Sequence, residues 1–249
     1  MANYDIAIFK GHGKSEKDGR FDCGAVGNNK TEYEVVNQLV EKIALLLTNS
    51  SYKVHVDENN YKDNDTLGNS YRLKYALSIH LNAGGGTGSE CIVPLGESYF
   101  KIENNILAEL SKLGFTNRGI KSRDYNSEKW SQRTHGIKMT GTNYYGEIRQ
   151  AWDNGISLTI LEVGFIDNLN DLNKILSNLD KIAYIVASSI AQEDGKVIKP
   201  LEEVKPATKP TNEFYRVVCG SFSNKANAEA RVKELKKHNF ECFIEKFNK

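Results

Sequence analysis

The stretch TEYEVVNQLVEKIALLLTNSSYKVHVDE, residues 31–58, decides the fold class of this chain. Residues 31–50 place apolar side chains every three or four positions, which predicts an amphipathic helix with one buried face. Residues 52–58 carry two valines in alternation with other residues and predict a strand. A long helix followed at once by a strand is typical of α/β proteins. The apolar residues on the helix face are Val35, Val36, Leu39, Val40, Ile43, Leu46 and Leu47.

The same alternation of helix and strand continues on both sides of this stretch. The sequence therefore predicts an α/β fold, a twisted and mostly parallel sheet flanked by helices on both faces. Residues 116–141 are polar with little periodicity, and they predict an irregular loop over the site. Strands are expected over residues 5–9, 52–58, 74–82, 89–94 and 155–165, and helices over residues 31–50, 100–114 and 170–193.

Length and composition limit the classes of protein. The 249 residues suffice for one sizeable core and a small second module. A net charge of +1 provides no global field for nucleic acid, so no nucleic-acid partner is expected. No apolar run approaches the length of a membrane span, so no membrane insertion is expected. Residues 1–5, MANYD, show no signal peptide, which predicts a protein held in the cytoplasm.

Two further features concern the organisation of the chain. Three prolines lie within residues 195–212, which predicts an extended linker. We therefore expect a catalytic domain over residues 1–194, a linker over 195–213, and a small βαβ module over 214–249. The cysteines show no C-x-x-C pair, which argues against a cysteine-rich zinc site and favours small buried apolar side chains. These cysteines are Cys23, Cys91, Cys219 and Cys242.

Candidate functional residues gather where strands end. His12 follows the first strand inside a Gly-His-Gly turn, His80 lies at the end of the strand over residues 74–82, and Glu162 lies near the end of the last strand. Ligands bind at the carboxyl ends of strands in parallel sheets, so these side chains are expected to converge. The alternative is a hydrogen-bonded histidine at a strand end and a salt-bridged surface acid.

A fourth candidate comes from the start of the first helix. Thr31 and Glu34 form a T-x-x-E capping box, which leaves Glu32 free to point away from the helix start. The alternative for Glu32 is an acid that merely favours the helix dipole. Two histidines and a carboxylate are a common ligand set of catalytic zinc, and a further carboxylate acts as general base. The four residues therefore suit metal-assisted hydrolysis.

Longer motifs surround these residues. The segments GHGKSEKDGRFDCGAVGNNKTE (residues 11–32), SIHLNA (78–83) and LEVGFIDN (161–168) resemble the motifs of zinc-dependent N-acetylmuramoyl-L-alanine amidases of the amidase-3 family. YYGEIR (144–149) also resembles a Tyr-Tyr-Gly-x-x-Arg segment of some members. One departure is that Phe9-Lys10-Gly11-His12 stands where the family has Asp-Pro-Gly-His.

The resemblance implies roles for individual residues. His12, Glu32 and His80 would bind Zn²⁺, and Glu162 would be the catalytic acid and base. The implied reaction cleaves the amide between the lactyl group of N-acetylmuramic acid and L-alanine in peptidoglycan. Asn82 and Arg149 are weaker candidates for contacts to substrate, with structural hydrogen bonding equally open. His135 is the substitute ligand if His12 or His80 fails, and His55 and His238 rank lower.

The end of the chain carries a second resemblance. Residues 215–247 are similar to a SPOR domain, a peptidoglycan-binding module. A full SPOR domain has two βαβ halves and this tail has one, and so short a unit buries little core. We therefore expect two tails to pair, which makes the protein a homodimer. The alternative is a tail that docks on its own catalytic domain or is poorly ordered.

The two resemblances together, with no signal peptide in view, predict a phage or prophage endolysin. Such an enzyme waits in the host cytoplasm and acts on the cell wall after release. Three alternatives stay open: a bacterial autolysin of the same chemistry, a zinc peptidase that cuts within the stem peptide, and a non-catalytic wall-binding protein.

Overall fold

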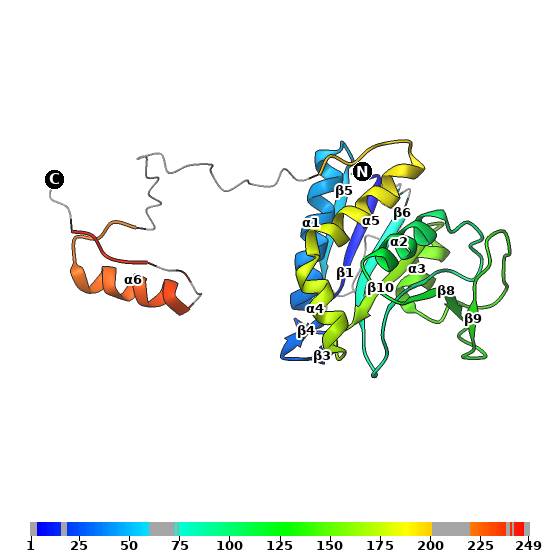
Figure 1. Cartoon of the computed structure of the whole chain (residues 1–249), viewed down its shortest axis with the longest axis horizontal. Helices are drawn as coiled ribbons and strands as arrows, with labels where there is room; N and C mark the ends of the chain where they lie inside the picture. The colour runs from blue at the N-terminus through cyan, green and yellow to red at the C-terminus, as the bar shows by residue number, and fades with distance from the viewer. Residues whose placement is uncertain are drawn as a thin grey trace. The chain divides into compact units, whose positions relative to one another are not determined.

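The computed structural model describes residues 4–15, 19–59, 73, 75–200, 220–237, 240 and 242–246 (Figure 1). The chain divides into two compact units, Met1–Leu201 and Glu202–Lys249. No helix within these described ranges is long and apolar enough to cross a membrane.

The first unit is built on one mixed sheet. Four neighbouring strands, β5, β1, β6 and β10, run parallel to one another, and β7 joins β10 in the opposite direction. Beyond β7 the sheet continues with β8, parallel to β7, and β9, antiparallel to β8. The strands in this spatial order are β5 (Val54–Asn59), β1 (Ile6–Lys14), β6 (Tyr75–Asn82), β10 (Leu158–Phe165), β7 (Ser89–Ile92), β8 (Asn117–Arg123) and β9 (Trp130–Gln132), and β2 (Phe21–Asp22) pairs with the end of β1.

Helices cover both faces of the sheet, because successive strand residues point to opposite faces. In β1, Ile6 and Ile8 join the larger core under α1, α2, α4 and α5, whereas Ala7 and Phe9 join a smaller core under α3. The predicted α/β fold with a mostly parallel sheet and helices on both faces is therefore confirmed. The helices of this unit are α1 (Glu32–Asn49), α2 (Lys101–Lys112), α3 (Gly146–Asp153), α4 (Leu169–Ser177) and α5 (Leu179–Glu193).

Two details of the first unit differ from the sequence-based expectation. Residues 116–141 are not an irregular loop, because they contain β8 and β9. This region is polar because much of its order comes from hydrogen bonds and ion pairs, such as those from Arg133 to the carbonyls of Leu95 and Glu97. The single helix expected over residues 170–193 is two helices, which meet at Asn178.

The boundary between the units lies inside the stretch predicted as a linker. Ile198 is buried in the core of the first unit, and the backbone N–H of Lys196 donates to the carbonyl of Ala191. Residues 201–219, which include most of the predicted linker, lie outside the described residues. The exact division at 194 and 213 stays a prediction.

The described part of the second unit contains one helix, α6 (Lys225–Lys237), none of whose residues is buried. Residues 242–246, expected to form a strand, have no regular secondary structure. An extended segment forms a strand only through hydrogen bonds to a neighbouring strand, and the described residues of this unit contain no strand. Cys219, His238 and the expected first strand of the tail lie outside the described residues. Cys91 is fully buried, while Cys23 and Cys242 are partly buried free thiols.

Candidate metal and catalytic site

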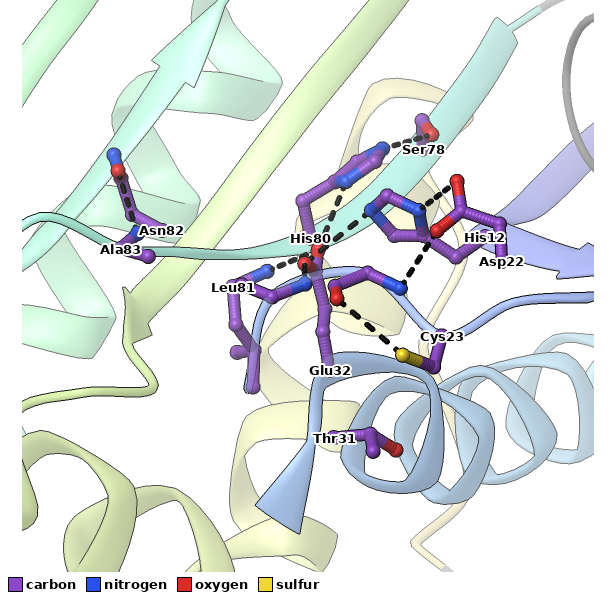
Figure 2. A network of polar contacts seen from close by, with 12 residues as sticks. His12, Asp22, Cys23, Thr31, Glu32, Ser78, His80, Leu81, Asn82 and Ala83 are labelled. Carbon is purple, nitrogen blue, oxygen red and sulfur yellow. Dashed lines mark hydrogen bonds and ion pairs between the residues drawn. The ribbon is translucent and has the colours of Figure 1, made fainter. Parts of the chain in front are cut away.

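Three side chains from distant parts of the chain meet near the carboxyl ends of β1 and β6. His12 comes from β1, Glu32 from the first turn of α1, and His80 from β6. One ligand atom of each lies within 4.8 Å of the others (Figure 2). We call these three residues the ligand cluster. It is the one group of three or more potential metal ligands among the described residues.

Local structure explains how Glu32 reaches this position. Thr31 caps α1, and its hydroxyl accepts from the backbone N–H of Glu34 while the Glu34 carboxylate accepts from the N–H of Thr31. The predicted capping box is therefore confirmed, and it occupies Glu34 rather than Glu32. Just before it, the two-residue β3 (Val26–Gly27) and β4 (Lys30–Thr31) pair through a tight turn and bring the chain back to the sheet.

Two glycines let the backbone approach the cluster closely. Gly11 has φ +67° and Gly24 has φ +69°, a region that favours glycine. A Cβ on Gly24 would lie 2.6 Å from Oε2 of Glu32 and 2.7 Å from Cδ2 of His12, and a Cβ on Gly11 would collide with the ring of His80. Both positions are therefore open only to a residue without a side chain.

The carboxylate of Glu32 is buried and fully engaged. Its Oε1 accepts from the backbone N–H of Leu81 at 2.9 Å and lies 3.0 Å from Nδ1 of His80. Its Oε2 accepts from the backbone N–H of Ala25 at 2.9 Å and lies 3.3 Å from Nε2 of His12. Figure 2 shows the dashed contacts that run from both rings to this one carboxylate. Burial opposes the charge on Glu32, but the hydrogen bonds with the two histidines outweigh it and hold the pKa well below its usual range.

The other nitrogen of each ring has its own acceptor. Nδ1 of His12 lies 3.0 Å from Oδ2 of Asp22. Nε2 of His80 lies 3.1 Å from the hydroxyl of Ser78 and 3.5 Å from Oε1 of Glu147. Burial favours neutral rings, but carboxylate neighbours, Glu32 for His12 and Glu147 and Glu32 for His80, raise both pKa values overall. Nε2 of His12 and Nδ1 of His80 therefore face the shared carboxylate.

Glu162 lies beside the cluster on β10. It is paired in register with His80 on one side and with Glu90 of β7 on the other. Its Oε2 is buried and has no hydrogen-bond partner among the described residues. Burial raises the pKa of Glu162 to about 7, and the neighbouring acids Glu32 and Glu90 add to the rise against the opposing effect of His80. A carboxyl with such a pKa can both take and return a proton near neutral pH.

Glu90 is more buried than Glu162 and is differently surrounded. Its Oε2 accepts from Nε of Arg118 at 2.6 Å and from Nζ of Lys121 at 2.5 Å, and its Oε1 accepts from Nδ2 of Asn82 at 3.1 Å. Both of its oxygens thus accept from protein donors. Asn82, a candidate for substrate contact, is one of the three residues that hold this acid.

The remaining candidates lie outside the cluster. Arg149 donates to the carbonyl of Asn143 and stacks on a tyrosine ring. His135 accepts from the backbone N–H of Phe100 at its Nδ1, and it is not among the grouped potential ligands. His55 lies 3.8 Å from Asp57 on β5.

Glu147 is the site residue that the sequence reasoning missed. It lies in the first turn of α3, is 3% exposed, and reaches His80 from the face of the sheet opposite α1. Glu147 lies inside the YYGEIR segment, but the resemblance of that segment rests on the two tyrosines, the glycine and Arg149. Nothing in the local pattern indicates which histidine a single glutamate at a helix start will meet.

Residues 6–192 match the family model described as N-acetylmuramoyl-L-alanine amidase. The chain belongs to this family. The amidase hydrolyses peptidoglycan, and its His–Glu–His cluster fits the metal site typical of the family. Two imidazole nitrogens and a buried carboxylate are ligands that suit a metal such as zinc. The second nitrogen of each ring faces a hydrogen-bond acceptor, as is typical of metal-bound histidines.

Two relatives support the assignment along nearly the whole chain. The sporulation-specific N-acetylmuramoyl-L-alanine amidase of Bacillus subtilis (strain 168) is 24% identical over 250 aligned residues, which cover 96% of this chain and 83% of that protein. The N-acetylmuramoyl-L-alanine amidase CwlM of Bacillus licheniformis is 28% identical, again over 96% of this chain and 83% of that protein. Among solved structures, Cwp6 from Clostridium difficile shares the fold, with a TM-score of 0.59 and 23% identity over 78% of this chain and 29% of that longer one.

A SPOR-domain model matches residues 160–246 of the amidase. The first part of this match contains most of β10 and all of α4 and α5, which belong to the amidase sheet and its helices. Only residues 202–246 of the match lie in the second unit. The amidase therefore carries a C-terminal SPOR region, a module that binds peptidoglycan.

Proposed function

We propose that the protein is a zinc-dependent bacterial autolysin that cleaves the amide between the lactyl group of N-acetylmuramic acid and L-alanine. The observation that carries the chemistry is the ligand cluster with Glu162 beside it. Glu32 is held ionised between two imidazoles, whereas Glu162 keeps a buried oxygen without a partner among the described residues. The first arrangement suits a cation and the second suits proton transfer.

His12, Glu32 and His80 would hold the metal. When bound, zinc supplies polarisation of the scissile carbonyl and lowers the pKa of a water molecule to about 7. Glu162 then takes the proton of the attacking water and returns it to the nitrogen of L-alanine as the amide breaks. The products are a glycan strand with a free lactyl carboxylate and a stem peptide with a free amino terminus.

Digestion of purified peptidoglycan tests this chemistry. We expect new L-alanine amino termini on intact stem peptides by mass spectrometry, lost with a chelator and restored by Zn²⁺. Ends inside the stem peptide would instead identify a peptidase that uses the same cluster. No new ends on several wall types, with zinc bound, would contradict the proposal.

The preference for an autolysin over a phage endolysin rests on two similarities. One relative is named as sporulation-specific, and the C-terminal SPOR region suits an enzyme that acts on the wall of the cell that makes it. Immunodetection in wall and cytoplasmic fractions during growth, sporulation and prophage induction tests this choice. Wall association without phage induction supports an autolysin. Release from the cytoplasm only during phage lysis supports the endolysin.

We also propose that the second unit pairs with a second copy. The exposed large apolar side chains of its described part are Phe222, Phe240, Phe243 and Ile244, at 46%, 61%, 81% and 43%, and no residue of α6 is buried. Such a surface suits a partner of the same kind, which would cover these exposed side chains. Sedimentation of the full chain is expected to give a dimer that Phe243→Asp dissociates. A monomer in the unchanged protein would overturn this proposal.

A further inference from the structure

The geometry points to Glu147 as a positioning residue: it holds the Nε2–H of His80 so that Nδ1 of the same ring faces the metal. The inference rests on the proposed function, because it assigns the ligand atom of a cluster residue. It concerns a residue that lies on α3, outside the segments 11–32, 78–83 and 161–168.

The two nitrogens of each histidine ring face different partners. Each ring presents one nitrogen to Glu32 and the other to an outer acceptor. For His12 the outer acceptor is the carboxylate of Asp22, at 3.0 Å from Nδ1. Metal-bound histidines typically donate their second N–H to a carboxylate, a carbonyl or a water, which fixes the tautomer and the orientation of the ring. His12 fits this pattern through Asp22.

His80 has the same kind of partner from a different element. Oε1 of Glu147 lies 3.5 Å from Nε2 of His80, with the Ser78 hydroxyl at 3.1 Å from the same nitrogen. A carboxylate favours the tautomer that carries the proton on Nε2, which leaves the lone pair of Nδ1 toward Glu32 and the metal. The two histidines would therefore bind through opposite ring nitrogens, Nε2 in His12 and Nδ1 in His80.

Burial points to the same role. Glu147 is 3% exposed, and its Oε2 is buried without a hydrogen-bond partner among the described residues. A buried carboxylate oxygen without a donor is costly, so its retention at a site calls for a role there. The adjacent Ile148 and, one turn further along α3, Ala151 pack in the smaller core, and this anchors the helix start that carries Glu147. The start of α3, and with it Glu147, is thus fixed by apolar packing.

The test combines zinc affinity, the protonation of His80 and turnover in three variants of the full chain. Zinc affinity is measured by competition with a chromophoric chelator. We expect Glu147→Ala to weaken zinc binding by about 10- to 100-fold. Glu147→Gln keeps the size and one acceptor oxygen, so its affinity is expected to lie between that of Glu147→Ala and the unchanged protein. Asp153→Asn, an exposed acid at the end of the same helix, is the matched control and is expected to change nothing.

Nitrogen-15 NMR of histidine in the zinc-loaded protein reads the ring directly, and it remains informative if Glu147→Ala fails to fold. The proposal requires His80 to carry its proton on Nε2 with Nδ1 bound to zinc. Zinc bound to Nε2 instead, or unchanged zinc affinity in a folded Glu147→Ala, would overturn it. If Glu147→Gln loses turnover about 100-fold or more at unchanged zinc affinity, Glu147 acts on the substrate instead, which also overturns it.

Failure of the proposed function gives a different result. In that case the unchanged protein releases no L-alanine amino termini from peptidoglycan, whatever the affinity of the variants for zinc. If the unchanged protein cleaves the expected bond and only the behaviour of the Glu147 variants departs from expectation, the function stands and the positioning role fails.

Discussion

Two acids lie beside His80, Glu32 and Glu162, and their surroundings suit them to opposite tasks. On one side, both oxygens of Glu32 accept from a backbone N–H and face a histidine ring, and its pKa is held well below the usual range. On the other side, burial raises the pKa of Glu162 to about 7, and one of its oxygens has no partner among the described residues. An acid saturated with donors stays ionised and can hold a cation. An acid short of donors can exchange a proton.

Glu90 shows that burial alone does not produce the second kind of acid. It pairs in register with Glu162, yet Lys121, Arg118 and Asn82 occupy its oxygens. The difference between these two neighbours is the supply of donors. If that supply separates the roles, substitutions of these acids and of their neighbours should have effects of different kind and size.

Replacement of Glu162 by glutamine is expected to have the largest effect. The amide cannot take the proton of water, so turnover should fall by about 10²- to 10⁴-fold while zinc affinity stays unchanged. Because burial raises the pKa of Glu162 to about 7, a base at this position gains its charge as the pH rises. Turnover of the unchanged protein should therefore rise with pH through the neutral region, and the residual turnover of the variant should not. Glu41→Gln, an exposed acid on α1, serves as the control. Undiminished turnover in Glu162→Gln would remove the proposed role.

Removal of the Glu90 carboxylate is expected to affect stability more than chemistry. In Glu90→Ala the cations of Lys121 and Arg118 lose their partner, and Asn82 loses its acceptor. We expect a loss of about 3 kcal/mol in the free energy of unfolding, near the lower limit for a broken buried pair because Arg118 is partly exposed. Denaturant unfolding measures it, with Glu109→Ala on the surface of α2 as the comparison. A variant of unchanged stability that loses turnover would place Glu90 with Glu162 as a chemical residue.

The residues of the site also differ in how far the sequence predicts them. The ligand cluster is predictable because each member has a local cause. A glycine turn precedes His12, a capping box frees Glu32, and a strand end presents His80. The helix over residues 31–50 and the central strands are predictable for the same reason, since periodicity is a local property of the chain.

The part of the sheet beyond β10, from β7 to β9, is held by contacts between residues that are far apart in sequence. Residues 116–141 predict a loop because their order comes from contacts such as Lys121 to Glu90 and Arg133 to the carbonyl of Leu95, which leave no apolar period. Glu147 escapes prediction for a related reason. Its contact with His80 depends on the packing of α3 against β10, and no pattern in the neighbouring sequence indicates that contact.

Gly24 offers a smaller test of the ligand cluster. In Gly24→Ala, the positive φ is expected to cost about 1–2 kcal/mol of unfolding free energy, and the new methyl crowds Glu32 and His12. Gly19→Ala is the matched control, because Gly19 has φ +71° but no atom of the described residues within 4 Å of an added Cβ. Both variants should lose stability in thermal unfolding, whereas only Gly24→Ala should weaken zinc binding. Equal zinc affinity in the two variants would mean that the cluster tolerates the methyl group.

The smallest expected effect belongs to Ser78, which shares Nε2 of His80 with Glu147. Its hydroxyl is the nearer acceptor, at 3.1 Å against 3.5 Å, but it carries no charge. A neutral hydrogen bond contributes about 1 kcal/mol, so Ser78→Ala is expected to weaken zinc binding by about fivefold. The loss stays small because the carboxylate of Glu147 still accepts the proton of Nε2. Chelator competition measures the change. A loss as large as that in Glu147→Ala would make the serine the main anchor of the ring, and the buried carboxylate would then need another explanation.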